Sequence, residues 1–454
     1  MELISSLESA LGQLAGFLWG PPLVTLLVGG GLFFLIYSRF VPYRHLGESL
    51  RLLTKPSDGD DPGQLSHFQA LCTALSGTLG MGNVSGVALA IAMGGPGAIF
   101  WMWVSALLGI ATKFYTCTLA VMYRGQDSEG TWQGGPMYVI REGLGRRWLP
   151  LAFFFALAGI FGTMPIFQVN QLVQILRDTI FIPYGITSAE SHFSFDLIMG
   201  VILAAIVLVV GLGKLPRLGR VSQVLVPSMV AGYILLTGFV IISHISEVPA
   251  ALALIVSDAF TGDAVAGGVV GTVIIMGIRR AAFSNEAGIG TEAMAHGAAR
   301  TKVPVKEGLV AMLGPIIDTL IVCTCTALVI LISGVWQTGD ADGATLTATA
   351  FGELFPMGGE IILAVLVSSL SLSTVFTFWY YGSKCLGFLV GARYQHHYIW
   401  FYIVLVVLGA ITSLQIVVNL IDSMYALMAI PTMTSALLLA PKVNQAVQAY
   451  FKAK

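Results

Sequence analysis

The sequence predicts an all-α membrane protein with about eleven transmembrane helices. Three observations support this fold class. Of the 454 residues, 56% are hydrophobic and only 10% are charged, whereas a soluble domain carries about 25% charged residues. The mean hydropathy of +0.84 is too high for a chain whose surface is mostly wetted. Basic residues also alternate along the chain as they do in proteins that cross a membrane many times.

The eleven spans are predicted from segment length and hydropathy. A helix needs roughly 20 residues to cross a hydrocarbon layer of ~30 Å. In chain order, the apolar segments that meet this requirement are 18–39, 68–93, 97–123, 149–182, 195–213, 219–244, 265–299, 306–335, 358–391, 397–413 and 416–440. Several are longer than a straight span requires, which favours tilted or broken helices.

The basic residues orient these spans. Segments 183–194, 245–264 and 336–357 contain no lysine or arginine. Nineteen of the 23 basic residues instead follow the odd-numbered spans or lie near their ends: Arg39, Arg44, Arg51 and Lys55; Arg124, Arg141, Arg146 and Arg147; Lys214, Arg217 and Arg220; Arg300, Lys302 and Lys306; Lys384 and Arg393; Lys442, Lys452 and Lys454. The other four are Lys113, Arg177, Arg279 and Arg280. By the positive-inside rule, we expect the N-terminus outside and the C-terminus in the cytoplasm of a multi-pass inner or plasma membrane protein.

The spans after the first divide into two sets of five. An odd number of spans in the first set makes the second set enter the membrane from the opposite side, which is the topology of inverted-repeat transporters. We therefore expect a peripheral first span with a cytoplasmic loop at 1–66, repeats at 67–262 and 263–441, and a cytoplasmic tail at 442–454.

The leading spans of the two repeats share a glycine interruption. Span 2 contains Gly80–Asn83, and span 7 contains Gly288–Thr291 within the segment FSNEAGIGTEA. Matched interruptions of this kind are the best sequence pointer to the binding site of a transporter. The alternative is close helix packing through small residues four positions apart, which Gly82 and Gly86 also fit.

A broken helix offers backbone groups to a ligand in the middle of the membrane. Irregular backbone persists in lipid only where it is buried or lines a cavity. The N-terminus of the new half-helix carries a positive partial charge that suits a carboxylate. The freed carbonyl oxygens suit an ammonium group or a desolvated alkali cation. The two interruptions therefore predict a site for a zwitterion together with a cation.

Four motifs carry a resemblance to a known family. They are GTLGMGNVSGVALAIAMGGPGAIFWMW at span 2, TWQGGPMYVIREGLG after span 3, FSNEAGIGTEAMAHGAA at span 7 and FWYYGSKC at span 9. With these motifs the chain resembles the alanine or glycine:cation symporter family, whose members have the leucine-transporter fold preceded by one extra helix. The chain departs from the family pattern at Thr291–Ala293, at Trp379, which adds bulk, and at Ser383, where the pattern has an acid.

The resemblance implies uptake of small neutral amino acids coupled to sodium, or to protons in some members. It implies sodium as a co-transported ligand and no cofactor. The expected partners are the amino acid, the cation and the lipid bilayer, and not nucleic acid.

The resemblance also implies a sodium site between spans 2 and 9. Its ligands are the backbone of Ser76 and Leu79 and the adjacent hydroxyls of Ser373 and Thr374, since hard cations prefer oxygen ligands. The alternative for the hydroxyls is hydrogen bonding to their own helix. The same break is expected to place four further residues beside the substrate: Gly77, Thr78, Gly80 and Gly82.

Span 4 adds two amides in the segment MPIFQVNQ. Gln168 and Asn170 follow Pro165, which weakens the helix. Amide groups can donate to a carboxylate and accept from an ammonium group without adding charge. The alternative is a hydrogen bond between helices, worth about 0.6 kcal/mol. Phe167, Phe283 and Trp379 are candidates to cap the cavity, although aromatic residues in spans more often pack or anchor at the interface.

The second break supplies Ser284, Asn285 and Glu286. An acid inside the membrane is functional by default. Two roles are open to Glu286, namely proton coupling and a salt bridge to a basic residue. Asp318 in span 8 also requires a partner. The candidates for coupling or gating are Glu286 and Asp318 with Arg279 and Arg280, and Lys113 is a further possible partner of Glu286.

The sequence therefore predicts a secondary transporter that imports a small neutral amino acid with sodium by alternating access. Proton coupling and a channel-like permease for another small solute are the alternatives, although two broken helices argue against a channel. The sequence has no P-loop and no HExxH motif, and these absences argue against ATP-driven transport and against an enzyme.

Overall fold

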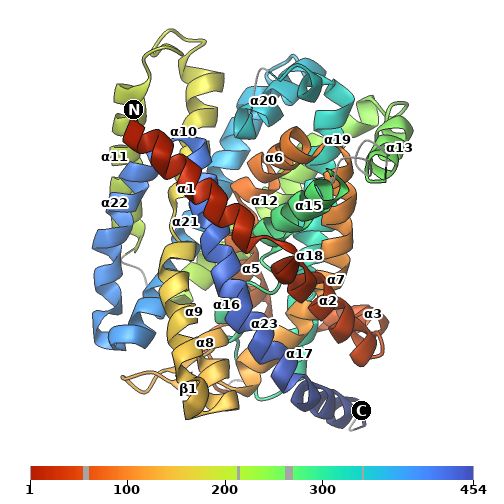
Figure 1. Cartoon of the computed structure of the whole chain (residues 1–454), viewed down its shortest axis with the longest axis vertical. Helices are drawn as coiled ribbons and strands as arrows, with labels where there is room; N and C mark the ends of the chain where they lie inside the picture. The colour runs from red at the N-terminus through yellow and green to blue at the C-terminus, as the bar shows by residue number, and fades with distance from the viewer. Residues whose placement is uncertain (1, 55–60, 212–214, 261–268, 340–341, 453–454) are drawn as a thin grey trace.

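The computed structural model describes residues 2–54, 61–211, 215–260, 269–339 and 342–452 (Figure 1). Within these ranges the chain is almost entirely helical. Lys55, Lys214, Lys454 and the predicted repeat boundary at 262/263 lie outside the described residues. The one sheet assigned in these ranges is a pair of two-residue strands, in which β1 (Gly125–Gln126) runs antiparallel to β2 (Trp132–Gln133).

The chain begins with a bent pair of helices. α1 (Glu2–Leu18) and α2 (Pro21–Tyr37) meet at 43°, because Pro21 and Pro22 can begin a helix but cannot continue one. The prediction of a first span at 18–39 covers α2 alone, and α1 is a helix that the apolar pattern did not predict. Two short helices follow, α3 (Val41–Arg44) and α4 (Leu46–Thr54).

The first half of the remaining chain begins with an interrupted helix. α5 (His67–Thr78) is followed by the short helix η1 (Met81–Asn83) and by α6 (Ser85–Gly94), with a bend of 62°. The elements that follow are α7 (Gly97–Met122), the hairpin, α8 (Pro136–Tyr138), η2 (Val139–Leu144), η3 (Arg146–Trp148), α9 (Leu149–Gly162), α10 (Ile166–Leu176), η4 (Arg177–Phe181), α11 (Phe193–Gly211), α12 (Leu215–Ser243) and α13 (Val248–Asp258).

The second half begins with another interruption. α15 (Val269–Asn285) ends five residues before α16 (Thr291–His296) begins. The elements that follow are α17 (Pro304–Ala311), α18 (Leu313–Pro315), η5 (Ile316–Cys323), α19 (Thr324–Ser333), η6 (Val335–Gln337), α20 (Gly343–Leu354), α21 (Gly359–Val390), η7 (Ala392–His397), α22 (Tyr398–Ile411) and α23 (Leu414–Lys452).

In the described ranges, eight helices are long and apolar enough to cross a membrane, or up to ten if each bent pair is one span. The predicted loops 245–264 and 336–357 contain the helices α13 and α20. The segment 442–452, predicted as a tail, continues α23.

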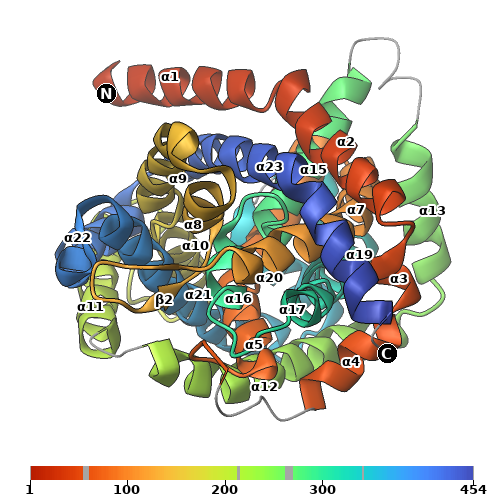
Figure 2. The same cartoon turned by 90° about the horizontal axis from the view of Figure 1, so that it is seen from below.

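The interrupted helices lie at the centre of the molecule. Figure 2 shows α5, α16 and α17 in the middle, with α11, α13 and α22 at the edge. Every residue of α16 is buried, as is every residue of α5 except Phe68 and Gln69. α5 packs against α12, α16 and α21. Because α5 and α16 are enclosed on all sides, their ends have protein rather than lipid around them.

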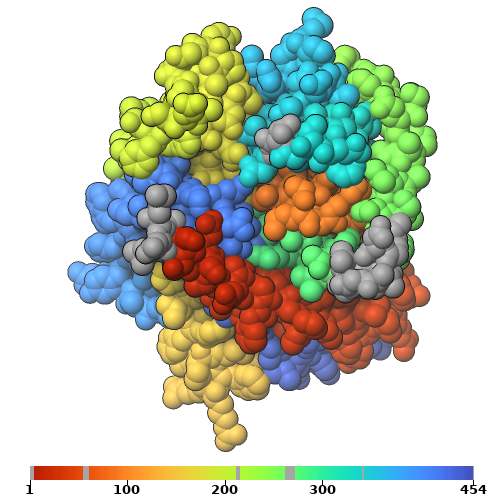
Figure 3. All heavy atoms as spheres, turned by 45° about the horizontal axis from the view of Figure 1, so that its top comes forward, coloured from red at the N-terminus to blue at the C-terminus, as the bar shows by residue number. Residues whose placement is uncertain are grey.

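The first helix lies on the outside. α1 packs along α23, at the other end of the chain, and Figure 3 shows it stretched over the surface. Phe17 near its end is 82% exposed.

Candidate functional site at the two helix breaks

The first break is shaped by a glycine that no other residue can replace without displacing its neighbours. α5 ends at Thr78, and Gly80 precedes η1. A Cβ atom on Gly80 would collide with Thr374 Oγ1 and would lie 2.7 Å from Gln168 Oε1. The side chains of α21 and α10 thus touch the backbone of the break directly.

Four oxygen atoms meet beside this break. Ser373 Oγ lies 3.5 Å from the carbonyl oxygen of Ser76, and Thr374 Oγ1 lies 3.4 Å from that of Leu79. Both hydroxyls also donate to the carbonyl of Leu370 one turn back, at 2.8 and 3.2 Å. The four residues predicted as cation ligands are therefore brought together, and their hydroxyls also make the contacts to their own helix that were the alternative. All four are at least 97% buried, and such a group of neutral oxygens suits a small hard cation.

A hydroxyl that sequence reasoning missed, that of Thr377, joins this group. Thr377 Oγ1 donates to Ser76 Oγ at 3.0 Å, and Ser76 Oγ donates to the carbonyl of Ser373 at 3.1 Å. Thr377 is one helical turn beyond Ser373 and faces the same way. This spacing is visible in the sequence and could have identified it.

Gln168 reaches the break from α10. Its Oε1 accepts from the backbone N–H of Met81 at 2.8 Å, which is one of the groups that unwinding leaves without a helical partner. Its backbone carbonyl accepts from Ser371 Oγ at 2.9 Å. Gln168 therefore connects α10, the break and α21.

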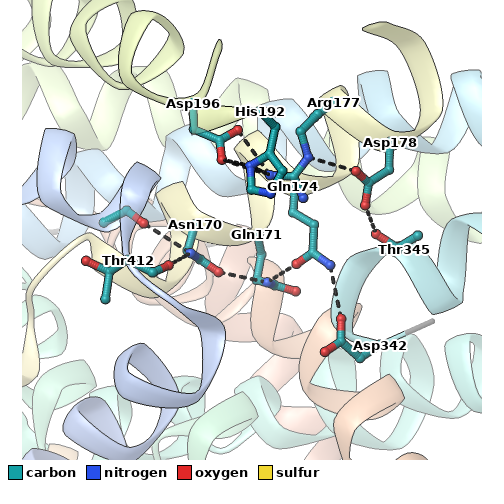
Figure 4. A network of polar contacts seen from close by, with 11 residues as sticks. Asn170, Gln171, Gln174, Arg177, Asp178, His192, Asp196, Asp342, Thr345 and Thr412 are labelled. Atoms are coloured by element: carbon teal, nitrogen blue, oxygen red, sulfur yellow. Dashed lines mark hydrogen bonds and ion pairs between the residues drawn. The ribbon is translucent and has the colours of Figure 1, made fainter. Parts of the chain in front are cut away.

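The side chain of Asn170 contacts the end of α22 and not the first break. Its Nδ2 donates to the carbonyl oxygens of Gly409 and Thr412 at the end of α22, at 3.1 and 2.7 Å, and its Oδ1 accepts from Gln171 (Figure 4). Two positions on a helix of 3.6 residues per turn point to nearly opposite sides, so Gln168 and Asn170 cannot both face the break. The structure does not bring Asn170 together with the other predicted substrate ligands.

A layer of aromatic rings covers the break. Phe283 packs edge-on against Phe167, with ring centroids 4.7 Å apart, and lies 5.4 Å from the ring of Tyr425. A Cβ atom on Gly82 would lie 3.1 Å from the Phe283 ring. The predicted capping residues Phe167 and Phe283 therefore lie together beside the break.

Trp379 lines a separate cavity of about 410 Å³ toward the hairpin end of the molecule. Its indole Nε1 is buried and has no hydrogen-bond partner among the described residues. Polar residues that share the cavity with it include Gln64, Asp127, Gln133, Lys384 and His396. Trp379 therefore faces a space from which polar solutes can approach.

The second break is held in an unusual backbone conformation. Glu286 has a φ of 56°, and Gly288 and Gly290 have φ of 84° and 100°. Positive φ is uncommon for a residue other than glycine and costs of order 1–3 kcal/mol. Such a conformation persists only where its surroundings enforce it, and strained residues cluster at functional sites.

The two breaks are joined by hydrogen bonds. Asn83 Nδ2 donates to Ser284 Oγ at 3.1 Å and to the carbonyl of Asp318 at 3.0 Å. Thr319 Oγ1 contacts both Ser284 Oγ at 3.0 Å and Asn285 Nδ2 at 3.2 Å. Ser284 and Asn285 therefore connect the interrupted helices to η5, and Thr319 is a further residue that the sequence reasoning missed.

The expected pairing of Glu286 with Arg279 or Arg280 is wrong. Both arginines bind the Oδ2 atom of Asp422, Arg279 at 2.6 Å. Glu286 accepts instead from Tyr425 at 3.1 Å and from Thr291. Asp422 lies within the predicted span 416–440, where an acid in an apolar segment was a signal that sequence reasoning did not use.

Lys113 on α7 lies among several buried carboxyl groups. It interacts electrostatically with Glu286, Glu292 and Asp318. Thr116, three residues along, donates to Glu292 at 3.2 Å, and Thr319 donates to Asp318 Oδ1 at 2.6 Å. Lys113 is thus a buried positive charge near these three acids, but no ion pair within 4 Å joins it to any of them in the described part of the chain.

Comparisons with known proteins show the family of this chain. The sequence pattern of the sodium:alanine symporter family matches residues 4–454. The chain is 38% identical over 449 residues to the sodium/alanine symporter AgcS of Methanococcus maripaludis, covering 97% of each chain. It is 34% identical over 453 residues to the probable sodium/glutamine symporter GlnT of Bacillus subtilis, covering 99% of this chain and 91% of GlnT.

A solved structure shares the fold. The crystal structure of MhsT in complex with L-phenylalanine superposes with a TM-score of 0.61 over 83% of this chain and 89% of MhsT. The sequence identity is 14%, so the likeness concerns the fold alone.

Proposed function

Because this chain belongs to the sodium:alanine symporter family, we propose that it imports a small neutral amino acid, of the alanine or glycine type, together with sodium. Members of this family are membrane transporters rather than enzymes. The observation that carries the proposal is the group of four oxygen atoms from Ser76, Leu79, Ser373 and Thr374 at the first break. This group offers a cation site that joins α5 to α21.

The substrate site lies next to the cation site. The freed N–H groups of the first break, with the half-helix that begins after it, receive the carboxylate. Gln168 is placed to exchange its bond with Met81 for a bond to the substrate. Little room is left around the backbone, because even a Cβ on Gly80 or Gly82 would press against neighbouring side chains. This narrowness favours a small substrate.

Sodium and substrate are coupled because both use the same break. A cation bound between α5 and α21 fixes the backbone against which the amino acid binds, so each ligand raises the affinity for the other. We place this site at the centre of eleven spans, one extra helix followed by two inverted sets of five, with breaks in spans 2 and 7. The N-terminus is then outside and the C-terminus in the cytoplasm, as the basic residues indicate.

Proton coupling remains the second candidate. It is favoured by the buried carboxyl groups of Glu286 and Asp318, which lie near Lys113 and within one hydrogen-bonded group with the second break. In a proton-coupled mechanism, protonation of Glu286 or Asp318, instead of sodium binding, precedes substrate binding. The third candidate function is a channel-like permease for another small solute.

Uptake into proteoliposomes tests the proposal. Purified protein is reconstituted, and accumulation of radiolabelled alanine and glycine is measured under an inward sodium gradient and, separately, under a proton gradient. We expect sodium to drive accumulation. Accumulation driven by protons alone would support the second candidate, and equilibration without any gradient would support a channel.

A further inference from the structure

A second cavity, of about 370 Å³, lies at the end of the molecule opposite the hairpin. It is bordered by the end of α6, by α15, by the residue that precedes α20 and by the start of α23 (Figure 1). Its polar lining consists of Arg279, Arg280, Asp342, Gln415 and Asn419. In the proposed orientation this cavity faces the outside of the cell, and the central site makes no use of these residues.

The floor of this cavity carries an excess of positive charge. Arg279 and Arg280 share the single carboxylate of Asp422, so the three side chains together carry one net positive charge. Arg280 is 1% exposed and Arg279 9%. A buried charge without a counter-charge is costly, and an anion in the cavity would balance it.

The same side chains also have more unpaired hydrogen-bond donors than unpaired acceptors. Arg279 Nε, Arg280 Nε, Arg280 Nη1 and Asn419 Nδ2 are buried donors without an acceptor among the described residues, against one acceptor without a donor, Asp422 Oδ1. Each unsatisfied buried group costs about 1–3 kcal/mol. These donors belong to residues that line the cavity, and a guanidinium group matches a carboxylate through parallel hydrogen bonds.

We propose that this cavity binds the carboxylate of an amino acid before the amino acid reaches the central site. Asp342, which also lines the cavity, provides a negative charge for the ammonium group and is itself held by Gln174 Nε2 at 3.1 Å. The cavity thus offers both signs of charge that a zwitterion requires. The amino acid as ligand rests on the proposed function, whereas the affinity for a carboxylate does not.

Arg280 and Phe283 connect the cavity with the central site. The Arg280 guanidinium lies 5.3 Å from the centre of the Phe283 ring, and that ring covers Gly82 and contacts Phe167. A carboxylate that competes with Asp422 for Arg280 loosens the side chain that holds this ring. Binding in the outer cavity therefore favours opening of the path to the break.

The test measures ligand binding to the purified full-length protein. Binding of radiolabelled L-alanine in sodium is followed by equilibrium dialysis, and binding of acetate, which has a carboxylate but no ammonium group, by the line width of [1-13C]acetate in NMR. The variants are Arg279→Gln, Asp422→Asn and, as a control, Arg177→Gln, whose arginine pairs with Asp178 and Asp196 outside this cavity.

The variants are expected to move acetate binding in opposite directions. Arg279→Gln leaves an Arg280–Asp422 pair with no net charge, so no buried charge lacks a counter-charge there. We expect this variant to bind acetate at least tenfold more weakly than the wild type. Asp422→Asn raises the net charge by one and tightens acetate binding by a similar factor. If thermal melting shows that Asp422→Asn does not fold, the acetate affinity of Arg279→Gln, compared with that of the wild type, decides whether the outer site exists. The control variant is expected to bind acetate as the wild type does.

For alanine, we expect two classes of site, of which Arg279→Gln removes only the weaker. A single class that is the same in wild type and Arg279→Gln, with acetate binding also unchanged, would overturn the outer site and leave the central site standing. Failure of the wild type and of every variant to bind alanine would contradict the proposed function. Acetate binding that depends on Arg279 would in that case still support the anion site.

Discussion

None of the four oxygen atoms beside the first break carries a formal charge. Two are backbone carbonyls and two are hydroxyls. A cation bound there is not neutralised by its own ligands, so it gains from the carboxylate of a substrate bound close by. This is a residue-level reason for simultaneous binding of sodium and an amino acid.

Replacement of Thr374 by alanine tests the cation site. The hydroxyl contributes one ligand oxygen, and polar contacts to a charged group are worth about 1.5–3 kcal/mol. We therefore expect Thr374→Ala to raise the sodium concentration for half-maximal uptake about tenfold. Thr374→Ser, which keeps the hydroxyl, is the matched control and is expected to resemble the wild type. An unchanged sodium dependence in Thr374→Ala would remove this residue from the site.

Gln168 and Asn170 are expected to behave differently although only one residue separates them. Gln168→Leu removes the amide beside the break and should weaken alanine binding several-fold at unchanged melting temperature. Asn170→Ala removes two hydrogen bonds to the end of α22, each worth about 0.6 kcal/mol. It should lower the melting temperature and leave the alanine affinity intact. Alanine affinity and melting curves, measured on the same preparations, check both predictions. Weakened alanine binding in Asn170→Ala would contradict the assignment of Asn170 to a structural role at α22.

At the scale of elements, the sequence indicated where α5 and α15 end but not how these helices are held. Glycine pairs and polar residues in apolar segments are visible in the sequence, and α5 and α15 do end beside them. The partner of Arg279 and Arg280 was not predictable from spacing, because Asp422 lies some 140 residues further along the chain. The direction of Asn170 follows from helix geometry, since residues two positions apart on a helix point to nearly opposite sides.

The α5–η1 corner tolerates no side chain at Gly80. Gly80→Ala is expected to abolish sodium-dependent uptake, because its Cβ displaces the Thr374 hydroxyl and the Gln168 amide. Gly238→Ala on α12, where a Cβ meets nothing within 4 Å, is the control and should transport normally. Both variants are compared for uptake and for elution as a monodisperse peak. Normal sodium-dependent uptake by Gly80→Ala would mean that the break is not the site.

The corner between α1 and α2 is fixed to α23 by one indole. Trp19 Nε1 donates to the backbone carbonyl of Asp422 at 2.9 Å, so this helix pair positions the acid that both arginines bind. Trp19→Phe is expected to lower stability by about 1 kcal/mol and to change the maximal uptake rate more than the substrate affinity. Trp132→Phe in the exposed hairpin is the control. Identical maximal uptake rates in wild type and Trp19→Phe would show that this contact of the α1–α2 corner does not influence transport.

At the scale of the whole molecule, the two interrupted helices are fastened together at the hairpin end. Arg124 donates to the carbonyl oxygens of Pro62 and Thr301, at 2.9 and 3.1 Å, and to that of Gly297 at 2.6 Å. It therefore binds the segment that leads into α5 and the segment that leaves α16. Burial lowers the pKa of Arg124 to about 10, against the opposing effect of Glu307 and Asp61, and the group stays charged at neutral pH.

Loss of this fastening should shift the balance between inward-closed and inward-open forms. Arg124→Gln is expected to increase the labelling, from the hairpin side, of a cysteine introduced at Gln133, which lines the 410 Å³ cavity. Arg141→Gln, which removes a half-exposed pair with Glu142, is the control. Equal labelling rates in the two backgrounds would contradict a role of Arg124 in closure.

The bond between Trp19 and Asp422 also has a consequence for how the protein is made. It joins residues 403 positions apart, and α1 rests along α23. α1 therefore cannot take its packed position until α23 has been synthesised. A ribosome that stops before α23 releases a chain in which α1 lacks the helix along which it packs.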